Sequence, residues 1–164
     1  MRRVLGGVAA AVLALTAVPA LAADEEVPTA PELLAPCALP AGATALTGEG
    51  FEGTIATPSF VAGNERESLV FVLDLAGSPV GTTAGVAGSL TWLVPANDYD
   101  LELQAGRASS TSENYQPVDP AEESVSAAGV AHCTKVTLTA VDFLAPVVAD
   151  TLELGVAVTP KLPA

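Results

Sequence analysis

The chain has 164 residues, of which half are apolar and 15% are charged, a composition typical of one packed domain rather than of a disordered segment. Nineteen acidic residues against six Lys and Arg give a formal net charge of −13. A protein this acidic repels nucleic acid and anionic lipid, so we expect neither nucleic acid nor a membrane as a partner.

The N-terminus has the pattern of an export signal. Arg2 and Arg3 precede an apolar run from Val4 to Val18, and Ala20-Leu21-Ala22 has the small-x-small form of a cleavage site. The run is too short to span a bilayer. Residues 1–22 are therefore predicted to be a signal peptide, and the mature protein is predicted to be secreted and extracellular.

Residues 23–48 are rich in Pro and Ala and show no period. Their four prolines exclude a long helix and a central strand, so this segment is predicted to be an N-terminal arm. It contains Cys37, and the only other cysteine of the chain is Cys133. Two cysteines in an oxidising compartment predict one disulfide.

Two other roles for these cysteines are disfavoured. A thiolate metal site needs more nitrogen or sulfur ligands than the single His132 supplies. A catalytic thiol would use His132 as its base, but His132 adjoins Cys133 in a run that reads as a strand. Neighbours in a strand point to opposite faces, which would separate the two side chains.

From residue 49 to residue 160 the sequence is typical of a single β-sandwich domain. Short apolar or alternating runs are separated by Gly, Pro, Asn and Asp, and no segment after the signal has a sustained helical period. Residues 77–88 and 105–121 are interpreted as loops. The predicted architecture is all-β, an antiparallel sandwich. Its expected strands are 51–57, 69–75, 90–94, 99–103, 123–127, 133–141 and 151–158.

Alternation within these strands predicts which side chains form the core. The inward set consists of Phe71, Leu73, Leu90, Trp92, Leu101, Leu103, Val136, Leu138, Leu152 and Leu154. Trp92 is assigned to the core rather than to a sugar-stacking site for this reason. The same alternation places Cys133 on the outer face, so the arm joined to it through Cys37 should cross the outside or the end of the sheet. A β-bulge after Cys133 would reverse that facing.

Four short motifs carry a family resemblance. They are Leu90-Thr91-Trp92, the run Asn97–Leu103, Glu122–Val125 and Val136-Thr137-Leu138. In this order and spacing, over about residues 51–158, the chain resembles the bacterial pre-peptidase C-terminal domain. Tyr99 and Glu102 replace the Leu and Tyr usual in that family, and no peptidase accompanies the domain in these residues. The resemblance implies a jelly-roll-like sandwich without catalysis, used as an accessory in secreted proteins.

Three carboxylates form the candidate metal site. Asp98, Asp100 and Glu102 alternate along one expected strand, which would align them on one face, and calcium prefers several oxygen ligands of this kind. The alternative is a solvated outer face that discourages edge-to-edge aggregation. Calcium is the only cofactor that the residues suggest.

Enzymatic activity is not expected. A glycosidase needs paired carboxylates in a cleft with stacking aromatics, of which this chain has few. A serine hydrolase would have only His132 as its base, and no Gly-x-Ser-x-Gly elbow is present. The sequence therefore predicts a secreted, non-catalytic module that interacts with an extracellular protein or glycan or has a structural accessory role. The alternative is calcium-assisted binding of a carbohydrate or cell-wall polymer.

Overall fold

The computed structural model describes residues 30–55, 66–112, 121–144 and 150–164. These residues form nine strands and no helix, so nothing in them is a helix able to cross a membrane. The predicted signal peptide, residues 1–22, and the first residues of the arm lie outside the described part. The strands are β1 (Thr44–Leu46), β2 (Phe51–Ile55), β3 (Arg66–Leu73), β4 (Thr83–Trp92), β5 (Asp98–Ala105), β6 (Ala108–Ser112), β7 (Ala121–Ala131), β8 (Lys135–Leu144) and β9 (Leu152–Lys161).

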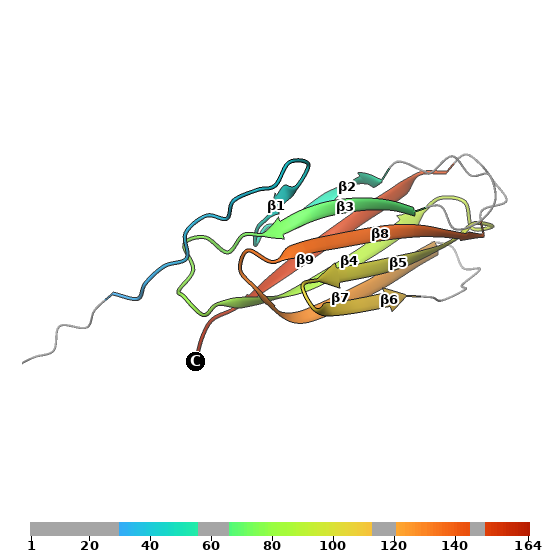
Figure 1. The fold of residues 1–164 in the computed structure, drawn as a ribbon. Helices are drawn as coiled ribbons and strands as arrows, with labels where there is room; N and C mark the ends of the chain where they lie inside the picture. Colours follow the sequence, from blue (N-terminus) through green and yellow to red (C-terminus); the bar gives the residue numbers. More distant parts are fainter. Residues whose placement is uncertain (1–29, 56–65, 113–120, 145–149) are drawn as a thin grey trace, which may run out of the picture. The chain divides into compact units, whose positions relative to one another are not determined.

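The strands form two sheets that pack face to face (Figure 1). One sheet has the order β1-β3-β8-β5-β6, and the other has the order β2-β9-β4-β7. The antiparallel pairs β2–β9, β3–β8, β4–β7 and β5–β6 are nested, as in one long hairpin rolled into a sandwich. This is the jelly-roll arrangement, and it confirms the predicted all-β sandwich. The exception to antiparallel pairing is β1, which lies parallel to β3 at the sheet edge.

The core lies between the two sheets and has the predicted composition. All ten side chains expected to point inward are buried, and Trp92, the most exposed of them, has 5% of its surface accessible. Two edge-to-face aromatic pairs lie in or against this core: Phe51 with Phe71, at 5.0 Å between ring centroids, and Trp92 with Tyr99, at 5.3 Å. The assignment of Trp92 to the core is therefore confirmed.

The structure corrects several expected loops. β4 already begins at Thr83, inside the segment interpreted as a loop, and β6 lies within the expected polar loop 105–121. β7 is also longer than expected, and β1 lies within the predicted arm. These segments are rich in Ser, Thr, Ala and Gly, so their pairing depends on neighbouring strands rather than on an apolar pattern. In the β5–β6 turn, Gly106 has a φ of 62°, which allows the short connection.

Candidate functional sites

The first candidate site is the disulfide at one end of the sandwich. Cys37 and Cys133 are bonded, with their Cα atoms 5.4 Å apart, as predicted. The expected strand from Cys133 is wrong, because β8 begins at Lys135 and Cys133 lies in the β7–β8 turn with a φ of 59°. Cys133 is exposed and Cys37 is half-buried. The arm thus meets the end of the sheet, as expected, although the turn and not strand alternation places it there.

Backbone contacts hold the arm on both sides of Cys37. Before it, Leu34 N–H donates to the carbonyl of Ser78 at 2.8 Å, and Val80 N–H donates to the carbonyl of Glu32 at 2.8 Å. After it, β1 pairs with β3. The position of Cys37 is therefore fixed by more than its disulfide.

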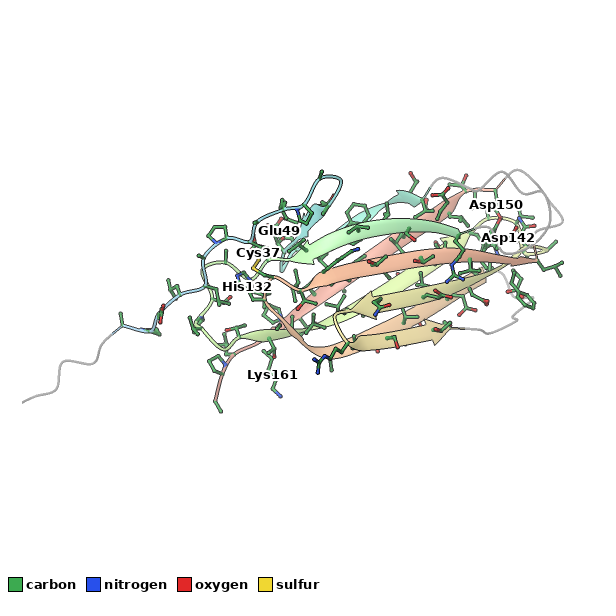
Figure 2. All side chains as sticks on the ribbon, viewed as in Figure 1. Cys37, Glu49, His132, Asp142, Asp150 and Lys161 are labelled. Carbon is green, nitrogen blue, oxygen red and sulfur yellow. A yellow bond between two sulfur atoms is a disulfide. The ribbon has the colours of Figure 1, made fainter. Side chains whose placement is uncertain are left out.

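His132 lies against this disulfide, which corrects the expectation that its side chain and that of Cys133 would point to opposite faces. The Leu75 N–H donates to its Nδ1 at 3.0 Å, so Nε2 carries the proton and donates to the carbonyl of Ala35 at 2.8 Å. Cys37 Sγ is 3.4 Å from each ring nitrogen, which places the sulfur over the face of the ring. Figure 2 shows Cys37 and His132 together at this end. The correction arises because His132 is in a turn, where strand alternation does not apply.

The three predicted metal ligands differ in exposure, and they do not form a group with carboxylate oxygens within 4.8 Å of one another. The register between β5 and β8 shifts at Asp98, and both Asp98 and the following Tyr99 are buried. Asp100 and Glu102 are half-buried, and Glu102 forms an ion pair with Arg66. Burial raises the pKa of the Asp98 carboxyl. Asp98 is therefore less accessible than the other two carboxylates, and calcium binding by the three stays a prediction.

A carboxylate that the sequence analysis missed organises the opposite end of the sandwich. Asp150 Oδ1 accepts hydrogen bonds from the N–H groups of Leu93 at 3.0 Å and Val94 at 3.2 Å. Its Oδ2 accepts a hydrogen bond from Asn97 Nδ2 at 2.8 Å, and the same amide nitrogen also donates to the Tyr99 hydroxyl at 3.2 Å. Asp150 thus fixes the turn between β4 and β5. Figure 2 places Asp142 at this end as well.

The same turn holds the two buried aromatic side chains in place. The Trp92 indole N–H donates to the carbonyl of Asn97 at 2.9 Å. Burial raises the pKa of the Tyr99 phenol above its ordinary value, and the negative charges of Asp150 and Asp142 act in the same direction. The cluster is therefore a structural network, and its polar groups satisfy one another at the end of the core.

A concavity lies on the outer face of the β2-β9-β4-β7 sheet. It encloses about 960 Å³ and adjoins a second hollow of about 500 Å³ on the same face. The two central strands present only small residues here: in register, Ser89 faces Gly155 and Ala87 faces Ala157. A Cβ on Gly155 would lie 2.9 Å from the Ser89 hydroxyl, so glycine keeps that hydroxyl accessible.

The borders of this hollow, which we call the β4–β9 hollow, differ on its two sides. Glu49 and Glu52 line it beside β2, and Ser124 and Ser126 line it on β7. The described residues that line it include no Lys or Arg. Its one aromatic residue, Phe51, has its ring against Phe71. The β4–β9 hollow is thus an open surface of hydroxyl and backbone groups with an acidic border.

Comparisons with known proteins add the following. No protein-family model matches the sequence, and a search of curated proteins finds no relative. Among solved structures, a match is found to the pre-peptidase C-terminal domain of collagenase from Bacillus anthracis, with 10% sequence identity and a TM-score of 0.38. The match covers 74% of this chain and 99% of that one. It is the kind of domain that the sequence motifs resemble. Similarity this weak carries no conclusion about function, and it is the strand order that defines the chain as a jelly-roll β-sandwich domain.

Proposed function

We propose that this protein is an exported, non-catalytic β-sandwich module that binds an extracellular partner through the β4–β9 hollow. The observation that carries the proposal is the hollow itself, an opening of about 960 Å³ on a sheet face with no bulky side chain to fill it. Strands β4 and β9 are central in their sheet, so the floor of the hollow is rigid. A rigid floor lowers the entropy lost on binding.

The state of the reactive side chains supports a non-catalytic role. Both ring nitrogens of His132, the single histidine of the chain, are engaged by backbone groups, and both cysteines are oxidised. The two oxygens of Asp150 accept hydrogen bonds that hold a turn. These groups stabilise the fold. The hollow, by contrast, presents accessible polar groups that can contact a partner. The N-terminal signal pattern and the disulfide support an extracellular location.

The chemistry of the hollow favours a basic polypeptide segment over a sugar. Sugar recognition commonly uses an exposed aromatic ring as a stacking platform, whereas Phe51 packs against Phe71. Glu49 and Glu52 line the hollow without a neighbouring Lys or Arg among its described lining residues. This acidic border complements a positively charged partner.

The test fills the hollow with a large side chain. Ala87→Trp places an indole at its centre, and Thr137→Trp on the outer face of the other sheet is the matched control. We expect the unmodified protein to bind a Lys-rich extended peptide and not a Glu-rich one, and Ala87→Trp to weaken that binding at least about tenfold while Thr137→Trp leaves it unchanged. Equal loss in both variants, or no preference between the peptides, would contradict the proposal. Binding to a polysaccharide panel that a chelator abolishes would instead support calcium-assisted glycan binding.

A further inference from the structure

The disulfide end of the sandwich brings three potential metal ligands together. One atom each from Cys37, His132 and Cys133 lies within 4.8 Å of the others, and no other group of His, Cys, Asp or Glu in the described residues does so. Tetrahedral zinc with ordinary bond lengths separates a sulfur from a nitrogen ligand by about 3.5 Å and two sulfurs by about 3.8 Å. The Cys37 sulfur is 3.4 Å from each His132 nitrogen but lies over the ring face, so its side chain must rotate toward the ring plane before both can bind one ion.

We propose that reduction of the Cys37–Cys133 disulfide converts this end into a binding site for a thiophilic divalent metal ion, with both thiolates and His132 Nδ1 as ligands. The oxidised pair holds its sulfurs too close for both to bind one ion. Reduction breaks the S–S bond and frees each side chain to rotate about its Cα–Cβ bond. The disulfide therefore prevents metal binding until it is reduced.

The hydrogen bonds of His132 determine which nitrogen binds the ion. Its Nε2–H donates to the Ala35 carbonyl, and a metal-bound histidine commonly keeps such a bond from its other nitrogen. That leaves Nδ1, where the ion replaces the hydrogen bond from Leu75 N–H. Asp74 Oδ1 lies 3.9 Å from Nδ1 and accepts the Ala76 N–H at 3.0 Å, and Asp74 is outside the group of three close ligands, so the fourth ligand is a water that Asp74 can hold.

The backbone around the site does not depend on the disulfide. Cys133 N–H donates to the Leu73 carbonyl at 2.8 Å, and Leu73 N–H donates to the Thr134 carbonyl at 2.9 Å. On the arm, the contacts of Glu32 and Leu34 and the pairing of β1 flank Cys37 on both sides. The reduced thiols therefore stay close to each other and to His132, which is what a preorganised site needs.

A reductant can reach the bond through Cys133. Its side chain is exposed in the turn, and exposed disulfides are more readily reduced than buried ones. Its φ of 59° is a conformation that residues other than glycine seldom adopt, as is common at functional positions. Two equivalents of a small thiol supply two electrons and two protons, giving two cysteine thiols and the disulfide of the reductant. Binding of the divalent ion then releases both thiol protons.

The experiment titrates Zn²⁺ or Co²⁺ into the mature protein after reduction and removal of the reductant under nitrogen. We expect one equivalent to bind, seen as a zinc adduct lacking two protons in native mass spectrometry and as the absorption of tetrahedral, thiolate-bound Co²⁺. Affinity should be at least about a hundredfold above that of the oxidised protein, and His132→Gln should weaken it about ten- to a hundredfold. Cys37→Ser should abolish the thiolate spectrum, and Glu122→Gln, at an exposed residue near the end of β7 away from the His132 turn, should leave binding unchanged.

Three results would overturn the proposal. The first is reduced protein that binds zinc no better than oxidised protein. The second is His132→Gln with unaltered affinity and cobalt spectrum, which would leave the thiols as the only contributors. The third is loss of the native near-ultraviolet signal of Trp92 and Tyr99 on reduction, since the site requires the fold to persist without the bridge. Because none of these readouts involves a peptide or glycan, their failure is distinct from failure of the proposed function.

Discussion

Gly88 lies on β4 at a point where the packing between the two sheets leaves no space for a side chain. It faces the core, and a Cβ built on it would lie 2.3 Å from Leu138 Cδ2 and 3.3 Å from Val125 Cγ2. Leu138 is fully buried, so its methyl group has no open space to move into. Overpacking of this kind costs about 1–3 kcal/mol, and the lower backbone entropy of alanine in the unfolded chain offsets about 0.4–1 kcal/mol. Gly88→Ala should therefore lower the free energy of unfolding by about 1–2 kcal/mol.

A second substitution isolates the clash. Leu138→Ala alone should cost about 2–5 kcal/mol, because it leaves a cavity in the core. In the double variant the Gly88→Ala methyl group occupies part of that cavity and meets no Cδ2 atom. The loss should then be smaller than the sum of the two single losses by about 1–2 kcal/mol. Gly85→Ala on the same strand is the matched control, since its Cβ would approach only the Thr159 carbonyl oxygen, at 4.0 Å.

Urea unfolding of the oxidised protein, followed by Trp92 fluorescence, measures the free energy of unfolding of the unmodified protein and of the four variants. The buried indole gives a signal that should change on unfolding. We expect Gly85→Ala to be neutral or stabilising by up to about 1 kcal/mol. The reasoning is refuted if Gly88→Ala is as stable as Gly85→Ala, or if the effects of Gly88→Ala and Leu138→Ala simply add.

Further predictions concern the two ends of the sandwich. Reduction of the bond between Cys37 and Cys133, which are 96 residues apart, should lower the free energy of unfolding by up to about 4–5 kcal/mol in urea melts; an unchanged midpoint would contradict this. Asp150→Ala should cost about 2–4 kcal/mol, with less lost in Asp150→Asn, because the amide oxygen keeps part of the hydrogen bonding. Since the pKa of Tyr99 is raised on folding, stability is full below the unfolded value of about 10 and falls as the pH rises toward the folded pKa. Tyr99→Phe should flatten that fall in alkaline melts. If Asp98 and its neighbours bind calcium, the melting temperature should rise with calcium concentration and Asp98→Asn should reduce the rise; no rise at millimolar calcium would exclude the site.

The core could be predicted from the sequence because alternation and burial coincide there. Leu101 and Leu103, like Leu152 and Leu154, lie on strands whose inward side chains are all apolar, and a shift by one residue would expose every one of them. The disulfide between Cys37 and Cys133 could also be predicted, since the chain has no third cysteine that could pair with either. These features depend on residue type at fixed spacing, which the sequence displays directly.

The sites depend on registers and turns that the sequence does not display. Asp98 lies where the pairing of β5 with β8 shifts, and nothing in the local residues marks that shift. Asp150 acts on backbone groups more than fifty residues earlier, which no local pattern can reveal. His132 contacts Cys37 because a tight turn ends the strand at Ala131, before the histidine. The positive φ of Cys133 in this turn had no signal such as a glycine.

The position of β9 has a consequence for the order in which the sheet forms during synthesis. The last strand of the sequence lies between β2 and β4, so it completes a sheet whose other members are synthesised well before it. Until residues 152–161 emerge, β2 lacks its partner in the sheet and one side of β4 is open. Most of the contacts join distant segments, which slows folding further. The β2-β9-β4-β7 sheet of a nascent chain therefore stays incomplete until residues 152–161 have been synthesised, and the sandwich closes only after that.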